Sequence, residues 1–419
     1  MSGASHPWFA SARFGMFVHW GHCSTRGGDI SWPLVGGAGS LLPHAHPVPV
    51  AQYHQSAFEF CPDPGAARLW LARAREAGMR YAVLTAKHHD GFALWPTERT
   101  DWSIRVTRYG GDLVAEFVEA ARAEGLRVGL YFSLCDWHHP DYPAFRDEDQ
   151  PYLRYLGRRP APEAWERYLD VLFGQVEELL TRYGTIDLLW FDGQWERSRD
   201  EWRADELAAR ARSLQPGIVI NDRLPGNGDY DTPEQALPAV TPERPWETCM
   251  TMNRTWAWCP DDDDYKDARQ LVHTLCEVAG RGGNLLLNVG PRADGSLPEE
   301  QVARLERIAQ WMAANRDAIH DTVPGLEPWQ FYGPTTRAGE RVFLHLLYRP
   351  YDTVTVRGLP LDRVRGVRHL ATGQELEWTA NAPVQALTAG GATGEVVIRV
   401  PPELVDDVAT VIELIVGGS

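Results

Sequence analysis

The chain has 419 residues, with 41 Lys and Arg against 57 Asp and Glu, and a formal net charge of −16. A content of 44% hydrophobic and 23% charged residues is ordinary for a globular protein, which excludes disorder as the main state. The acidic balance argues against nucleic acid or an anionic membrane as a partner, because both attract a basic surface. The length predicts two or three domains.

The cysteines and the N-terminal residues favour a reducing compartment. Six cysteines are scattered without a CxxC pair, so free thiols are expected. The first residues contain no basic segment followed by an apolar one, and no apolar run reaches the length of a membrane span. We therefore expect a cytoplasmic protein without a membrane partner, and the sequence carries no signal for an oligomeric state.

Apolar runs alternate with amphipathic segments through the first three quarters of the chain. Strands are expected at 14–21, 81–86, 127–134, 186–192, 217–222, 246–252 and 284–290. Helices are expected at 64–78, 112–125, 163–183, 199–213, 265–280 and 298–317. Near-continuous apolar strands are typical of a parallel sheet covered on both faces. Residues 1–328 therefore predict a catalytic (β/α)8-like TIM barrel. A doubly wound open sheet is the alternative, although no Gly-rich phosphate loop follows the first strand.

Beyond residue 328 the helical periodicity stops, and short alternating strands with Gly- and Pro-rich turns take over. Residues 329–419 therefore predict a C-terminal antiparallel β-sandwich. Just before this change, the acidic run CPDDDDYKD (259–267) is interpreted as the N-terminus of a helix rather than a calcium loop, because the helix dipole favours negative charge there.

Polar residues lie in or directly after the expected strands, most of them towards the carboxyl ends. The active sites of such barrels lie at the carboxyl ends of the strands, so these residues should meet at one rim. They are His19, His88, His89, Tyr131, Asp192, Asn221, Arg223, Glu247 and Asn288. The chain is also rich in Trp, with 17 in all, and eight lie in or beside these motifs. Those eight predict an aromatic wall around a ring-shaped ligand: Trp20, Trp95, Trp137, Trp190, Trp195, Trp246, Trp256 and Trp258.

Asp192 is the main catalytic candidate, because it follows the four apolar residues of 188–191 and precedes a Gly. A second carboxylate would make the pair a glycosidase site, and the candidates are Glu234 and Glu247. A separation of about 5 Å would support double displacement at a sugar carbon, whereas about 6.5–9.5 Å would leave room for water and inversion.

The histidines allow a second interpretation. His19, His88 and His89 could join Asp192 in binding a divalent metal, as in metal-dependent barrel hydrolases. There is no HxH pair on the first strand, and adjacent His88 and His89 on an extended backbone point to opposite sides. Hydrogen bonds from these rings to sugar hydroxyls are therefore favoured over metal ligation.

Several motifs, in this order, resemble the α-L-fucosidases of glycoside hydrolase family 29 over about residues 8–300. They are FGMFVHWG (14–21), YAVLTAKHHDGFALWPT (81–97), TDWS (100–103), GLYFS (129–133), LLWFDG (188–193), PWETCMTMNRTWAW (245–258) and GRGGNLLLNVGPRADG (280–295). The resemblance implies a barrel with a C-terminal β-sandwich, a fucosylated oligosaccharide as substrate, and a retaining mechanism without metal or organic cofactor.

The resemblance also implies roles for individual residues. Asp192 matches the nucleophile, and Glu234 is preferred over Glu247 as the general acid/base. Matching positions line the fucose pocket, with Trp190 against the apolar side of the sugar: His19, His88, His89, Tyr131, Trp190 and Arg223.

One departure bears on specificity. One group of these fucosidases has an EWY segment soon after the first strand, and this chain has GGDISWPLVGGAG (27–39) there. With WETCMTMN present, this favours the group that prefers α-1,3/1,4-linked fucose. A glycosidase of altered, galactosidase-like sugar specificity and a non-catalytic carbohydrate-binding barrel are the remaining alternatives, and the latter is disfavoured because the carboxylates are present.

Overall fold

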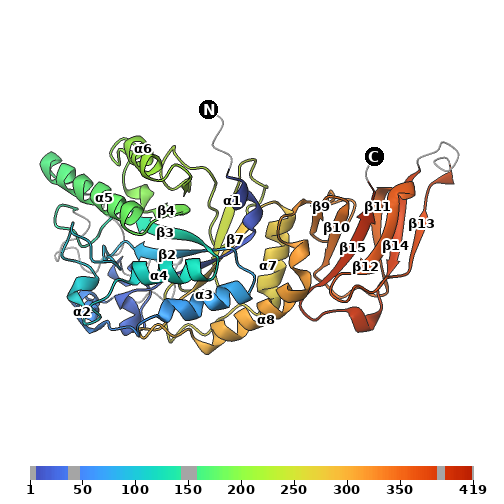
Figure 1. Ribbon diagram of the computed structural model, residues 1–419, viewed down its shortest axis with the longest axis horizontal. Coiled ribbons are helices and arrows are strands. Elements are labelled where there is room, and N and C mark those ends of the chain that lie inside the picture. Colours follow the sequence, from blue (N-terminus) through green and yellow to red (C-terminus); the bar gives the residue numbers. More distant parts are fainter. Residues whose placement is uncertain (1–5, 36–47, 143–157, 385–391, 418–419) are drawn as a thin grey trace. The chain divides into compact units, whose positions relative to one another are not determined.

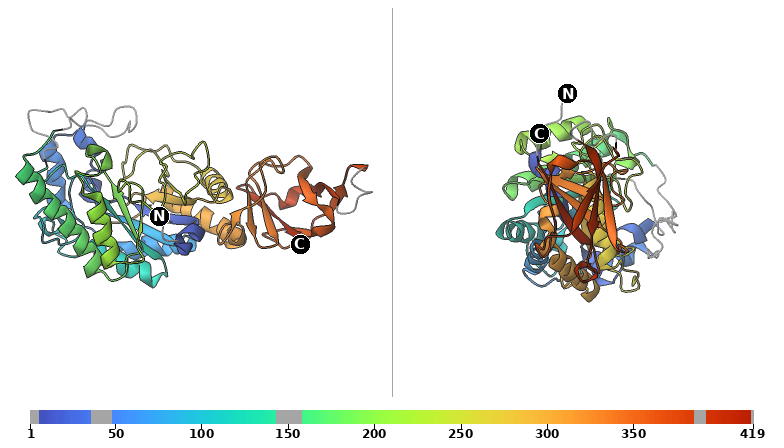
Figure 2. Two further views of the ribbon diagram at one scale, coloured as in Figure 1. Left: turned by 90° about the horizontal axis from the view of Figure 1, so that it is seen from above. Right: turned by 90° about the vertical axis from the view of Figure 1, so that its right-hand side faces the viewer.

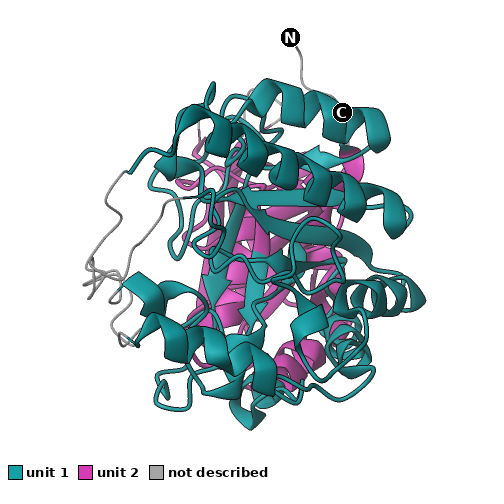
Figure 3. Cartoon of the chain, turned by 90° about the vertical axis from the view of Figure 1, so that its left-hand side faces the viewer, with its two compact units in different colours: residues 1–6, 14–265, 286–303 teal, residues 7–13, 266–285, 304–419 magenta. Residues whose placement is uncertain are grey.

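The structure is a computed structural model, which describes residues 6–35, 48–142, 158–384 and 392–417. The chain forms two compact units, coloured separately in Figure 3. The first contains residues 14–265 and 286–303, and the second contains residues 7–13, 266–285 and 304–419. The domain boundary at residue 328 that composition indicates stays a prediction.

A seven-stranded sheet forms the centre of the first unit (Figure 1). Its order is β5-β4-β3-β2-β1-β7-β6, and the pairings from β1 through β5 are all parallel. The strands are β1 (Phe14–Val18), β2 (Tyr81–Lys87), β3 (Arg127–Ser133), β4 (Leu188–Asp192), β5 (Val219–Ile220), β6 (Glu247–Thr251) and β7 (Asn284–Val289). Every residue of these seven strands is buried except the first residue of β3. The apolar runs are therefore interior strands, and the predicted barrel-like fold is confirmed.

A short segment, residues 230–234, completes the ring between β5 and β6. Tyr230 forms a parallel bridge with Asn221, next to β5. On its other side, Asp231 bridges Trp246 and Glu234 bridges Cys249. This irregular eighth element has no helix of its own and places Glu234 on the wall of the barrel.

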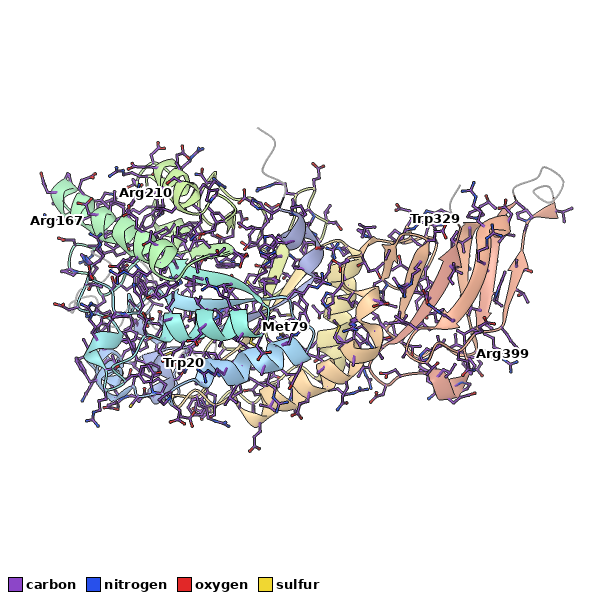
Figure 4. All side chains as sticks on the ribbon, viewed as in Figure 1. Trp20, Met79, Arg167, Arg210, Trp329 and Arg399 are labelled. Atoms are coloured by element: carbon purple, nitrogen blue, oxygen red, sulfur yellow. The ribbon has the colours of Figure 1, made fainter. Side chains whose placement is uncertain are left out.

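Within the described ranges, the six predicted helices are present in the predicted order, and two further helices precede them. They are α1 (Pro7–Ala12), α2 (Val50–Glu59), α3 (Ala66–Glu76), α4 (Leu113–Ala123), α5 (Pro162–Arg182), α6 (Ala204–Leu214), α7 (Ala268–Gly280) and α8 (Glu299–Asn315). Neither α1 nor α2 was expected. Exposed arginines mark the outer faces of α5 and α6, where Arg167 and Arg210 are labelled in Figure 4. Among the described residues, no helix is long and apolar enough to cross a membrane.

Of the acidic run 259–267, only the last residue caps the helix that follows it. Asp267 caps α7 by accepting a hydrogen bond from the Gln270 backbone N–H, and the Gln270 side chain returns the contact. Asp262 instead turns back to accept hydrogen bonds from the backbone of Arg254 and Thr255. The first turn of α7 contains no acidic residue, so the predicted acidic N-terminus is reduced to the cap.

The second unit contains two antiparallel sheets, visible as separate layers in Figure 2. One has the order β12-β15-β10-β9-β8 and the other β11-β14-β13. Their bounds are β8 (Val323–Pro324), β9 (Thr335–Ala338), β10 (Arg341–Leu346), β11 (Thr353–Pro360), β12 (Val364–His369), β13 (Trp378–Asn381), β14 (Thr393–Arg399) and β15 (Thr410–Val416). Residues from both sheets share one apolar core, including Leu344, Val356, Ile398 and Leu414, so the predicted β-sandwich is confirmed.

Where β5 ends, the side chain of Asn221 takes the place of a backbone hydrogen-bonding partner for β4. β5 has only two residues, and beyond it the Asn221 amide accepts a hydrogen bond from the Phe191 N–H at 2.8 Å and donates to the Phe191 carbonyl at 2.9 Å. This pair continues the β4–β5 ladder to the residue before Asp192.

We expect Asn221→Ala to lower the free energy of unfolding by about 2–4 kcal/mol, because two buried backbone groups of Phe191 lose their partners. Urea unfolding measures this effect. The same substitution at the half-buried Asn227, whose side chain binds Asp205 on the surface, should cost less than about 1 kcal/mol. Equal losses in the two variants would contradict the role given to Asn221.

Candidate active site

The rim of the barrel brings together the polar residues that follow the strands. Asp192 is the last residue of β4, Tyr131 lies in β3, and Arg223 follows β5. His19 follows β1, and His88 and His89 follow β2. All but Arg223 are buried, because each side chain points inward from a buried strand or strand end.

The Asp192 carboxylate is held by one donor on each oxygen. Tyr131 donates its hydroxyl hydrogen to Oδ2 at 2.8 Å, and Arg223 donates from Nη1 to Oδ1 at 2.8 Å. Burial and the neighbouring Asp192 charge raise the pKa of Tyr131 well above its usual value, so it remains a donor. These two contacts fix the plane of the carboxylate.

Arg223 joins this carboxylate to a second one. Its Nη2 donates to Glu234 Oε2 at 2.6 Å, while its Nε donates to Thr232 at 3.2 Å. Burial alone would lower the pKa of Arg223, but the charges of Asp192 and Glu234 outweigh it and the pKa is raised. One permanently charged guanidinium thus lies between an almost buried carboxylate and one whose side chain is 38% exposed.

Three neutral histidines line the same site. Burial lowers the pKa of His19 and His88 well below the usual range, and it lowers that of His89 to about 3. The Nδ1 atom of each ring contacts a polar side chain: Asn288 at 2.6 Å for His19, Ser31 at 2.7 Å for His88, and Ser133 at 2.8 Å for His89. The sequence indicated Asn288, but Ser31 and Ser133 were missed. Ser133 could have been found as the polar residue that ends β3.

Glu247 lies deep inside the barrel, because it begins β6 instead of ending it. It is 0% exposed and accepts hydrogen bonds from Trp190 Nε1 at 3.0 Å, Tyr230 at 3.3 Å and the Tyr81 hydroxyl. Gly15 leaves room for Tyr81, since a Cβ there would be 2.4 Å from the Tyr81 ring. The expectation that Glu247 lies at the rim with the other polar residues is therefore wrong.

Trp190 links this buried carboxylate to the rim. It stacks on Tyr131 at 5.5 Å, and the Arg223 guanidinium lies 4.7 Å from its ring centroid. These aromatic and cation–π contacts, together with the hydrogen bond to Glu247, fix the ring beneath Arg223.

The aromatic wall differs from the predicted one. Trp20 packs on Trp70 in the core, and Trp95 donates a hydrogen bond to Glu178 of α5, so neither belongs to the site. Trp32 was missed: it contacts the His89 ring at 5.4 Å and stacks at 6.5 Å with Trp195, which is 48% exposed.

His88, His89 and Asp192 also form a candidate metal-binding group, with one ligand atom from each within 4.8 Å of the others. Both carboxylate oxygens of Asp192 already receive hydrogen bonds, and one of the donors is the Arg223 cation. A metal ion here would be repelled by Arg223, so these residues fit a hydroxyl group better than a divalent cation.

A barrel whose rim carries two carboxylates joined by one arginine, with neutral histidines and aromatic rings beside them, has the site of a glycoside hydrolase. The sequence model of the family described as Alpha-L-fucosidase matches residues 2–317. The chain belongs to the alpha-L-fucosidase family.

Relatives support this family in sequence and in structure. Tissue alpha-L-fucosidase of Bos taurus is 28% identical over 406 residues, covering 89% of this chain and 82% of that protein. Alpha-L-fucosidase isoenzyme 1 from Paenibacillus thiaminolyticus is 37% identical, with a TM-score of 0.84 and 98% of both chains covered.

A third relative bears on mechanism. An alpha-L-fucosidase from Bacteroides thetaiotaomicron was solved as a trapped covalent intermediate with 2-fluoro-fucosyl fluoride, in a glutamate-to-glutamine variant. It is 28% identical to this chain, with a TM-score of 0.82, and the match covers 98% of this chain and 95% of that one.

The buried Glu247 makes the stability of the protein depend on pH. Burial raises its pKa to about 7 from 4.5, so the folded state holds this proton more tightly than the unfolded chain. Stability from this group is therefore complete below about pH 4.5 and is lost as the pH rises toward about 7. Between pH 5 and 8, we expect the wild type to lose about 1–3 kcal/mol more unfolding free energy than Glu247→Gln.

Urea unfolding at each pH measures this difference. Glu196, whose pKa is also raised to about 7 by burial, is present in both proteins and cancels. Parallel pH profiles for wild type and variant would show that Glu247 is ionised in the folded state.

Proposed function

We propose that this chain is an exo-acting, retaining α-L-fucosidase that removes terminal α-linked L-fucose from oligosaccharides or glycoconjugates by double displacement. The observation that carries the proposal is the single Arg223 guanidinium bonded to both Asp192 and Glu234. Two carboxyl groups spanned by one guanidinium are compatible with the separation of about 5–5.5 Å found in retaining enzymes.

In the first step Asp192 attacks the anomeric carbon and the bond to the leaving oxygen breaks. Arg223 and Tyr131 orient the carboxylate for this attack. Glu234 lies at the more exposed side of Arg223, where a leaving group would extend toward solvent, and gives its proton to the leaving oxygen. The product is a fucosyl ester of Asp192.

In the second step Glu234, now ionised, takes a proton from water, and the water oxygen attacks the anomeric carbon. The ester bond breaks, Asp192 regains its charge, and fucose leaves with its original configuration. Glu247 is assigned no proton transfer here, because its two oxygens face three donors inside the barrel.

An exo mode of action is supported by the depth of the site. The histidines and Asp192 form a floor that is almost entirely buried, and neutral rings suit an uncharged sugar. Such a floor suits the terminal sugar of a glycan.

Azide separates the two carboxylate roles. In Asp192→Gly, turnover of 4-nitrophenyl α-L-fucoside should fall by roughly 10³-fold or more, because no nucleophile remains. Azide should restore turnover and give β-L-fucosyl azide, with inverted configuration. In Glu234→Ala, azide should instead intercept the glycosyl-enzyme and give α-L-fucosyl azide.

Glu247→Ala is the matched control for the second carboxylate. It should lose activity without rescue by azide, because Trp190 and the two tyrosines lose their common acceptor. Rescue of Glu247→Ala but not of Glu234→Ala would reverse the assignment of the acid/base.

We further propose a preference for α-1,3/1,4-linked fucose on branched glycans, supported by the departure at residues 27–39 from the EWY segment. In that region Trp32 stacks with Trp195 beside His89 and offers two rings to a leaving-group sugar. Hydrolysis of a branched α-1,3/1,4-fucosylated trisaccharide should exceed that of a linear α-1,2-fucosylated one by about tenfold or more in kcat/KM. Equal rates, or faster cleavage of the α-1,2 linkage, would contradict the preference.

A further inference from the structure

The β-sandwich carries a groove of its own, formed by residues of the second unit where β11, β13 and β14 lie side by side. Its volume is about 330 Å³. Small-molecule sites typically have volumes of about 300–1,000 Å³, so the groove is large enough for a small ligand. The lining includes Arg357, Gly358, Asn381, Gly394 and Glu395.

A β-bulge in β11 forms one side of the groove. The register of β11 against β14 shifts between Val356 and Leu359. The two residues between them, Arg357 and Gly358, therefore lie opposite the single residue Glu395. Gly358 has a φ of 66°, a conformation that favours glycine. Val356 is buried in the apolar core whereas Arg357 is exposed, so the bulge carries its polar side chain on the solvent side.

Trp329, labelled in Figure 4, lies against this bulge and is 65% exposed. The end of its ring occupies the space beside Gly358, where a Cβ would be 2.5 Å from the nearest ring atom. Any other residue at position 358 would push the indole away. The glycine therefore brings a large, exposed aromatic ring against the backbone that lines the groove.

Gln330 fixes the turn that carries Trp329. Its side chain donates from Nε2 to the Arg357 carbonyl at 3.0 Å and accepts from the Glu327 N–H at 3.0 Å. Its backbone carbonyl accepts from the Arg357 N–H at 2.9 Å. Because the turn is bonded to β11 in this way, the backbone of Trp329 needs little further ordering when a ligand binds.

The charged side chains of the groove balance each other. Arg357 Nε donates to Glu395 Oε1 at 3.0 Å, and among the described residues that line the groove these two alone are charged. Asn381 pairs with Glu395 in register from β13 and adds an amide to the same row. Donors and acceptors side by side suit the hydroxyl groups of a neutral sugar, whereas Glu395 would repel an acidic ligand.

We propose that this groove is a second carbohydrate-binding site, which takes a neutral oligosaccharide with one sugar ring against Trp329 and hydroxyl groups on Arg357, Glu395 and Asn381. The apolar C–H face of a pyranose covers part of the exposed indole and removes apolar surface from water. The choice of a glycan backbone of galactose and N-acetylglucosamine as the ligand rests on the proposed function. Such a site adds affinity for the glycan and takes no part in bond cleavage.

NMR of the full-length protein labelled with ¹⁵N-tryptophan tests binding at Trp329, whose indole signal is assigned with Trp329→Phe. The probe is lacto-N-tetraose, a neutral tetrasaccharide that contains galactose and N-acetylglucosamine but no fucose. It should shift the Trp329 signal saturably, with a Kd of about 0.1–1 mM. No saturable shift up to about 5 mM would overturn the proposal. A shift with a neutral proline-rich peptide and none with the sugar would also overturn it.

This readout is independent of the proposed hydrolysis, because the probe offers no fucose to cleave. Binding of the probe by a protein that does not hydrolyse fucosides would leave the second site in place. Hydrolysis of fucosides without binding of the probe would refute the second site and leave the proposed function in place.

Trp329→Ala should weaken binding of the probe by about tenfold or more, as measured by calorimetry. Tyr351→Ala is the matched control, because it removes another exposed aromatic ring of the same unit, and it should leave the Kd unchanged. Equal Kd values for wild type and Trp329→Ala, or equal losses in the two variants, would contradict the site.

A second pair of variants separates binding from any effect of Trp329 on folding. Arg357→Ala removes a hydrogen-bonding group of the groove and should raise the Kd by about threefold to tenfold. Arg399→Ala breaks a comparable exposed ion pair, with Glu377, and should not change it. Urea unfolding checks that each variant is folded. A Kd that Arg357→Ala leaves unchanged would overturn the placement of the sugar hydroxyls.

Discussion

The guanidinium of Arg223 is the constraint on which the rest of the site depends. It bonds to Asp192 and to Glu234 with separate nitrogens and lies over the Trp190 ring. A guanidinium is planar and always charged, so it fixes direction as well as distance. A lysine here could neutralise one carboxylate, but it could not hold two carboxylates in a set relation while stacking on an indole.

Buried residues inside the barrel hold the Trp190 ring against which Arg223 lies. Glu247 accepts hydrogen bonds from the Tyr81 hydroxyl, the Tyr230 hydroxyl and the Trp190 indole, and the Trp190 ring lies beneath Arg223. The two glutamates that the sequence offered as general acid/base thus lie at different depths in the same barrel. The buried one orients an aromatic ring, and the exposed one faces solvent where a leaving group would depart.

Much of the fold could be predicted because a parallel sheet buried on both faces leaves continuous apolar runs. The strand ends also located Asp192, Arg223 and the histidines, since carboxyl ends of parallel strands meet at one rim. Glu247 was misplaced although the predicted strand 246–252 begins almost where β6 does: a residue that begins its strand does not lie at the rim with the residues that end theirs, and Glu247 is buried inside the barrel. Ser31 could not be found, because it reaches His88 from an irregular segment with a φ of 58°.

Covalent labelling tests the central claim most directly. The protein is incubated with 2-deoxy-2-fluoro-L-fucosyl fluoride, digested, and the modified peptide is sequenced by mass spectrometry. If Asp192 is the nucleophile of a retaining reaction, one fluorofucosyl group will be attached to Asp192, and labelling will cease in Asp192→Gly. A label on any other residue, or rapid release of the sugar without a covalent adduct in Glu234→Ala, would contradict the account.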